Sequence, residues 1–90
     1  MDPALERFVA YLERNKIRAT YKAVGEAAEI PPRSLGDRLG EKCARASWVM
    51  NDSTGDPTGY TEHQKHPDLY STEEIIRSGD DLIRRMKREK

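Results

Sequence analysis

The chain has 90 residues, of which 36% are hydrophobic and 36% are charged, and its 16 basic and 16 acidic residues give a formal net charge of zero. This length predicts one domain over residues 1–90 with a modest core. The balanced charge excludes a strongly basic nucleic-acid binder but leaves room for a local basic face.

The sequence also limits location and cofactors. Cys43 is the only cysteine, so no intramolecular disulfide can form, and we expect a reducing, cytoplasmic environment. The first residues lack a basic region followed by an apolar one, and no apolar window approaches the roughly 18 residues of a transmembrane helix. We predict a monomer without a cofactor and without membrane association.

Residues 3–15 carry the clearest helix pattern. Asp2 is a suitable N-cap, and Pro3 suits the first helical position. An apolar face is formed by residues spaced as i, i+3, i+4 and i+7, namely Leu5, Phe8, Val9 and Leu12.

Two shorter helices are predicted next. Residues 20–29 follow Thr20 as the cap, and the inward-facing residues are Ala23, Val24 and Ala27. Prolines 31 and 32 end this helix, and Pro32 can open another that runs to about Leu39 and ends at Gly40. Two short helices joined by a tight turn predict a helix-turn-helix.

A hairpin is predicted after these helices. Residues 46–51 are rich in strand formers, NDSTGDPTG is dense in turn formers, and residues 58–61 could return as the partner strand. The expected fold is therefore α+β and mostly helical: a winged helix-turn-helix with a small β-hairpin wing and a C-terminal helix.

The C-terminal helix is predicted from a capping box of Ser71 and Glu74 that follows the loop TEHQKHPDLY. Gly79 could divide this helix into two pieces, with Ser78 as the second cap. Its apolar face would be formed by Ile75, Ile76, Leu82, Ile83 and Met86.

Four short stretches agree in order and spacing with a known family. TYKAVGEAAEI is followed by RSLG at 33–36, by ASWVMNDSTG at 46–55, and by Gly-Tyr at 59–60. Over residues 17–61 the chain resembles the DNA-binding C-terminal domain of the alkylguanine-DNA alkyltransferases. That family typically shows Thr-Tyr-Gly, then Arg-Ala-Val-Gly, then Pro-Cys-His-Arg-Val, then Gly-x-x-Gly-x-Tyr.

The reactive motif of that family is altered here. Ser47 stands in place of the acceptor cysteine, Trp48 in place of the histidine and Val49 in place of the arginine. Alkyl transfer requires a thiolate that a neighbouring base generates, and a serine hydroxyl is a far poorer nucleophile. The chain therefore resembles the non-catalytic alkyltransferase-like proteins, which bind damaged DNA without repairing it, and we predict no enzymatic activity.

The resemblance implies two groups of site residues. In the family, the arginine matched by Arg33 fills the space of an extruded base, and small residues such as Ser34 and Gly36 let the helix approach the minor groove. With Lys22 and Arg38 as possible phosphate contacts, the predicted DNA-binding residues are Thr20, Tyr21, Lys22, Arg33, Ser34, Gly36 and Arg38. The predicted base pocket consists of Ser47, Trp48, Val49, Tyr60 and Thr61.

Each of these assignments has a purely structural alternative. Trp48 could anchor the core, Gly36 could permit helix packing, and Arg33 could be a solvated arginine. His63 and His66, with Asp68 nearby, lack a third firm metal ligand, so we predict no metal site.

Three functions follow from these readings. The first is a non-enzymatic DNA-binding module that recognises flipped or alkylated bases in DNA repair. The second is a protein-interaction adaptor that kept the fold and lost DNA binding. The third is an enzyme that uses Cys43 or Ser47.

Overall fold

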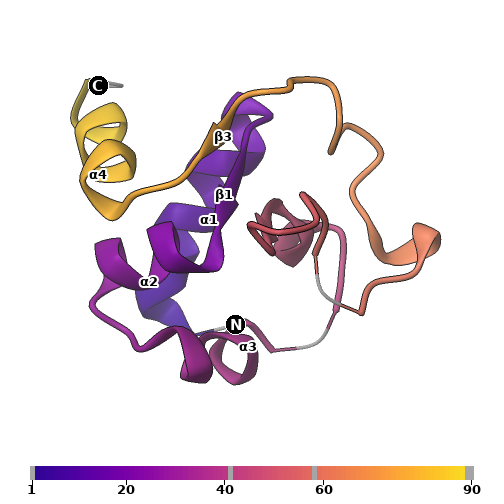
Figure 1. The fold of residues 1–90 in the computed structure, drawn as a ribbon, viewed down its shortest axis with the longest axis horizontal. Coiled ribbons are helices and arrows are strands. Elements are labelled where there is room, and N and C mark those ends of the chain that lie inside the picture. The colour runs from indigo at the N-terminus through magenta and orange to yellow at the C-terminus, as the bar shows by residue number, and fades with distance from the viewer. Residues whose placement is uncertain (1, 41, 58, 89–90) are drawn as a thin grey trace.

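The computed structural model describes residues 2–40, 42–57 and 59–88. Within these ranges the chain forms four α-helices and three short strands (Figure 1). The strands β1 (Arg18–Thr20), β2 (Val49–Met50) and β3 (Ile75–Ile76) form one parallel sheet in the order β2-β1-β3. The central strand pairs Ala19 with Val49 on one side and with Ile76 on the other. The fold is therefore α+β, as predicted.

Helix α1 (Pro3–Asn15) has the predicted bounds. Asp2 caps it, because one carboxylate oxygen accepts a hydrogen bond from the amide of Ala4 at 2.9 Å. The helix ends at Lys16, whose φ of 56° is left-handed and turns the chain into β1. The predicted apolar face is buried: Leu5, Phe8, Val9 and Leu12.

Helices α2 (Tyr21–Ala28) and α3 (Pro32–Leu39) confirm the predicted pair of short helices. The Thr20 hydroxyl caps α2 by accepting a hydrogen bond from the amide of Ala23 at 3.0 Å. Gly40, with a φ of 80°, ends α3. Ala23, Val24 and Ala27 are buried, as predicted for α2, and α3 packs through the buried Leu35 and Leu39.

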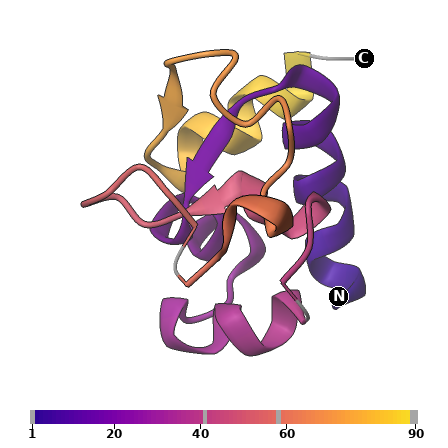
Figure 2. The ribbon, with the colours of Figure 1, turned by 90° about the vertical axis from the view of Figure 1, so that its right-hand side faces the viewer.

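The predicted β-hairpin does not form. Residues 45–48 are a short 3-10 helix, η1 (Arg45–Trp48), and β2 then pairs with β1 instead of with residues 58–61. Thr58 lies outside the described residues, and residues 59–61 have no strand structure. An isolated hairpin is marginal in water, whereas β2 is fully buried beside the central strand. Residues 51–57 instead form a loop that projects at the left of Figure 2 and is closed by a 2.9 Å bond from the Asn51 amide to the Asp56 carbonyl.

The predicted start of the C-terminal helix was also wrong. The Ser71 hydroxyl donates to the Asp68 carbonyl, and Ile75 and Ile76 form β3. Branched side chains suit a buried strand, so pairing with β1 prevails over the local helix pattern. Helix α4 (Gly79–Arg88) begins only after Ser78, whose hydroxyl accepts from the amide of Asp81 at 3.2 Å, as the second predicted cap requires. A second short 3-10 helix, η2 (Glu62–Gln64), lies in the preceding loop.

One hydrophobic core joins the helices to the sheet. Trp48, Phe8, Leu35, Leu69 and Leu82 are among its fully buried side chains. None of the helices in the described ranges is long and apolar enough to cross a membrane.

Close packing of α2 against α4 depends on a glycine. A Cβ built on Gly79 would lie 2.5 Å from the Cβ of Glu26 and 2.7 Å from the backbone nitrogen of Ala27. The Glu26 carboxylate also accepts a hydrogen bond from the Gly79 amide at 2.9 Å. The contact therefore leaves no room for a side chain at this position.

Gly79→Ala should lower the free energy of unfolding by about 1–3 kcal/mol, because the added methyl must displace backbone as well as side-chain atoms. Urea unfolding followed by circular dichroism measures the change. The matched control is Gly36→Ala in α3, where a Cβ would meet nothing within 4 Å. There alanine should stabilise the helix by up to about 1 kcal/mol. Equal effects of the two substitutions would contradict the packing argument.

Candidate functional site

A hollow of about 540 Å³ opens beside α3. Tyr21 contributes from the first turn of α2, and Arg33 and Gly36 contribute from α3. Leu39 at the end of α3 and residues that follow this helix supply the rest of the wall, so the hollow is lined by Tyr21, Arg33, Gly36, Leu39, Gly40, Lys42 and Tyr60. The structure thus brings together four predicted site residues: Tyr21, Arg33, Gly36 and Tyr60.

Arg33 is exposed at the beginning of α3 and forms no ion pair within the described ranges. The positive end of the helix dipole disfavours a cation at this position. Neither electrostatics nor packing within the fold accounts for an arginine here. Its side chain is free to meet a negatively charged or aromatic ligand at the mouth of the hollow.

Gly36 is exposed in the middle of α3, and a Cβ at this position would meet nothing within 4 Å. The packing alternative is therefore not supported. A glycine inside a helix costs about 1 kcal/mol relative to alanine. The absence of a side chain keeps this surface of α3 open, which allows a ligand backbone to approach the helix closely.

Tyr21 and Tyr60 are half-buried aromatic walls of the hollow. Burial raises the pKa of Tyr60, and Cys43 and Tyr21 act in the same direction, while a hydrogen bond with the Cys43 backbone opposes the shift. The phenol is thus neutral at physiological pH. Both rings can stack on a planar ligand, and each hydroxyl can donate a hydrogen bond.

Sequence reasoning missed Lys42. Gly40 turns the chain after α3, and the ammonium group of Lys42 then lies beside Gly59, 3.0 Å from where a Cβ of that residue would be. No local pattern predicts this contact between segments 17 residues apart, because it depends on how the loop returns. Only the basic character of the stretch around Cys43 pointed to it.

Ion pairs separate the basic side chains into paired and unpaired sets. Within the described ranges, carboxylates pair with Lys16, Arg38, Arg45, Lys65, Arg77 and Arg85. Arg18 bonds to carbonyl groups and Arg14 has other interactions. The remaining cations of these ranges belong to two groups: Lys22, Arg33 and Lys42 near the hollow, and Arg7, Arg84, Lys87 and Arg88 on α1 and α4.

The other predicted DNA-binding residues do not line the hollow. Thr20 is buried as the cap of α2, and Ser34 is half-buried. Arg38 is exposed but bonds to the carboxylate of Asp2 at 2.8 Å, which ties α3 to the start of α1. Lys22 is exposed on α2, next to Tyr21 in the chain.

Three of the predicted base-pocket residues are in the core. Ser47, Trp48 and Val49 are fully buried, so they cannot face an open pocket in this structure. The Ser47 hydroxyl donates to the Ala44 carbonyl at 2.5 Å and accepts from the His66 amide at 3.0 Å. Local structure decides this placement, because the 3-10 turn of residues 45–48 directs the segment inward, against α1.

Trp48 and Thr61 have structural roles. The Trp48 ring packs against His66 with ring centroids 4.9 Å apart, and its indole nitrogen has no hydrogen-bond partner among the described residues. Thr61 is exposed and caps η2, where its amide donates to the side-chain oxygen of Gln64 at 2.9 Å.

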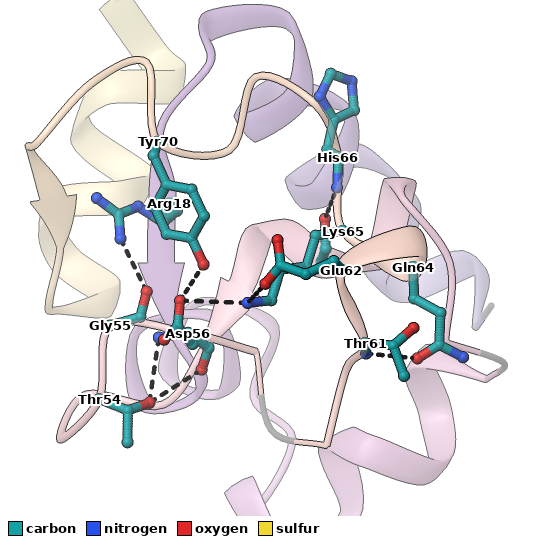
Figure 3. Close-up of polar contacts among 11 residues, drawn as sticks. Arg18, Thr54, Gly55, Asp56, Thr61, Glu62, Gln64, Lys65, His66 and Tyr70 are labelled. Atoms are coloured by element: carbon teal, nitrogen blue, oxygen red, sulfur yellow. Dashed lines mark hydrogen bonds and ion pairs between the residues drawn. The ribbon is translucent and has the colours of Figure 1, made fainter.

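A polar network around Arg18 of β1 holds the loop at 51–57 and the segment before β3 together (Figure 3). Arg18 is buried and donates to the carbonyls of Gly55 at 2.8 Å and Thr72 at 3.2 Å. The Tyr70 hydroxyl donates to Asp56, and the Lys65 ammonium lies 3.8 Å from the same carboxylate. Burial raises the pKa of Tyr70, and the bond to Asp56 raises it further. These contacts tie the loop at 51–57 to the segment before β3, which is a structural role.

Metal chemistry finds no support in the described ranges. No group of three or more His, Cys, Asp or Glu side chains there is arranged to hold a metal ion. His66 instead accepts a hydrogen bond at Nδ1 from the amide of Asp68 at 3.0 Å.

Comparison of the chain with family models, with curated proteins and with solved structures gave no significant match.

The burial of Trp48 predicts its fluorescence. Because this is the only tryptophan, its emission should be blue-shifted and should resist quenching by iodide far better than in the urea-unfolded chain. Addition of duplex DNA should leave the emission unchanged. Strong quenching by DNA would contradict the core position and would restore the stacking role.

Proposed function

We propose that this chain is a non-enzymatic DNA-binding module of the alkyltransferase-like kind, which tests flipped or alkylated bases in a hollow beside α3. The observation that carries the proposal is the meeting of Tyr21, Arg33, Gly36 and Tyr60 around one hollow. Three of these four residues lie on two different helices, and the fourth is 24 residues further along the chain than Gly36. The resemblance to the alkyltransferase family had named all four.

In this proposal α2 and α3 act as a helix-turn-helix, and α3 enters the minor groove. Gly36 permits the close approach, and Arg33 fills the space that an extruded base leaves. Lys22 and Lys42, which form no ion pair within the described ranges, contact phosphates on either side. The loop at 51–57 takes the place of the hairpin wing.

The two tyrosines provide the means of testing a base. Stacking of a base on an aromatic side chain contributes about 1–3 kcal/mol. Tyr21 and Tyr60 offer two such rings, and the neutral Tyr60 hydroxyl can hydrogen-bond to a base edge. Planar, uncharged bases therefore suit this hollow, and Lys42 suits a phosphate at its rim.

We propose that the chain has no enzymatic activity because of the environment of Ser47. Its hydroxyl is fully buried and engaged in two hydrogen bonds to backbone groups. A nucleophile must reach its substrate and have a base within hydrogen-bond distance, and neither condition is met at Ser47. Cys43 is exposed, and its free thiol suits a reducing, cytoplasmic setting.

The alternative function is an adaptor that kept the fold and lost DNA binding. Zero net charge and the exposed Asp37 on α3 favour it. Lys22, Arg33 and Lys42, which form no ion pair within the described ranges, favour DNA binding, because phosphates can pair with cations around the hollow. Titration with duplex DNA at low salt separates the two, since the adaptor would not bind.

Arg33→Ala should weaken binding to a duplex that contains a modified or mismatched base by about tenfold or more, because the extruded base then leaves an unfilled gap. Fluorescence anisotropy at several salt concentrations measures the affinity and its salt dependence. The wild-type affinity should fall with added salt in proportion to the phosphates neutralised.

The matched control is Arg84→Ala, which removes an exposed, unpaired arginine from α4, away from the hollow. This variant should bind within about twofold of wild type at physiological salt, where charges beyond a Debye length are screened. Equal losses in the two variants would mean that Arg33 contributes only general charge.

Gly36→Ala provides a second test, because stability and binding should change in opposite directions. The variant should unfold at higher urea concentration. It should bind the same duplex about tenfold more weakly, because the added methyl group hinders the approach of the ligand and each lost contact costs about 1 kcal/mol. Urea unfolding followed by circular dichroism and fluorescence anisotropy on the same samples give both quantities. Unchanged binding would show that the ligand does not approach this part of α3.

A further inference from the structure

A second hollow lies between α1 and α4. It has a volume of about 330 Å³ and is lined by Arg7, Phe8, Ile83, Met86 and Lys87. A neighbouring hollow of about 270 Å³ shares Ile83 and Lys87 and adds Asp80 and Arg84. The two hollows adjoin along α4 because they share Ile83 and Lys87, and we call them together the α4 groove.

The floor of the α4 groove is apolar. Phe8 is buried, while Ile83 and Met86 are half-buried and pack against the core cluster. Their outer surfaces contribute to the groove on a helix that is otherwise strongly charged. The α4 groove therefore combines apolar side chains with a polar rim.

The rim of the α4 groove is basic. Arg7, Arg84 and Lys87 form no ion pair within the described ranges, although Arg85 on α4 pairs with Glu74 at 2.6 Å and Asp81 at 3.1 Å. The helix dipole accounts for cations at the end of α4, whereas Arg7 extends from α1, where its guanidinium carbon lies 4.8 Å from the centroid of the Phe8 ring. Asp80 is the only acidic residue that lines the groove in the described ranges, and it lies in the first turn of α4.

We infer that the α4 groove binds an acidic, amphipathic helical segment of a partner protein. Apolar side chains of such a segment would cover Ile83 and Met86, and its carboxylates would pair with Arg7, Arg84 and Lys87. This is the helix-in-groove mode, in which apolar anchors one helical turn apart supply most of the contact. Helix α4 has 10 residues and is about 15 Å long, so it matches about three turns of a bound helix.

The apolar floor and the position of the α4 groove distinguish this site from the proposed DNA site. Phosphate binding requires cations but no apolar floor. The α4 groove combines cations with an apolar floor. Figures 1 and 2 place α3 and α4 at opposite ends of the molecule, so both sites can be occupied at once. A second copy of this chain fits the groove poorly, because the apolar faces of α1, α2 and α3 are buried in its own core.

The test is titration of the full chain with a synthetic peptide of about 15 residues, or about four helical turns, that carries leucines on one face and glutamates on the other. Amide NMR shifts should be confined to α4 and to the first half of α1. The double variant Arg84→Gln/Lys87→Gln should weaken binding roughly three- to tenfold, because it removes two exposed charge pairs. It should leave binding to DNA unchanged.

The matched control is Lys22→Gln/Lys42→Gln, which removes the same charge near the α3 hollow. This variant should keep its affinity for the peptide and lose affinity for DNA. The inference fails if both double variants weaken peptide binding equally, or if a peptide with glutamine in place of glutamate binds as well. It also fails if the peptide causes no shifts or if duplex DNA shifts the α4 resonances instead. If the wild-type chain does not bind DNA, the proposed function is overturned but the inference about the α4 groove is not.

Discussion

The structure depends on the burial of one three-residue strand. β1 bonds to β2 on one side and to β3 on the other, and all three of its side chains are buried. Arg18 at its start reaches two loop carbonyls, from Gly55 and Thr72, and so ties together segments that lie far apart in the chain. Thr20 at its end caps α2 and thereby fixes Tyr21 at the edge of the α3 hollow. A small chain with a modest core obtains its long-range order from this strand.

Pairing of charges divides the surface by role. Within the described ranges, several basic side chains are neutralised by carboxylates of other elements, as Arg45 connects η1 to Glu6 on α1 at 2.8 Å. Cations without such partners occur around the α3 hollow and around the α4 groove. Zero net charge therefore conceals two local basic sites at opposite ends of the molecule, one with aromatic walls and one with an apolar floor. In the two proposals, cations beside aromatic walls serve bases and phosphates, and cations beside an apolar floor serve an acidic protein segment.

The sequence motif and the folded site coincide only in part. Tyr21, Arg33, Gly36 and Tyr60 were named from the resemblance and do meet. Ser47, Trp48 and Val49 were expected beside them, yet the 3-10 turn before β2 buries all three in the core. Lys42 replaces them in the wall of the hollow. A reactive group must be exposed to reach its substrate, whereas an apolar segment such as Trp48-Val49-Met50 is more stable when it is buried. A short sequence motif does not show which of the two positions the segment takes in the folded chain.

Local signals in the sequence by itself determined α1, α2 and α3, because caps, prolines and apolar spacing act within a few residues. Asp2, Thr20 and Gly40 end or begin these helices where they were expected. Only the tertiary structure decided the sheet, since strands of two or three residues have no periodicity and pair with partners about 30 to 57 residues away. Ile75 and Ile76 fit a helix pattern locally, but they form a strand because they pair with the edge of β1 that β2 leaves open. The physical reason is that backbone hydrogen bonds of a buried strand must be satisfied, and the residues that satisfy them are chosen by the fold as a whole.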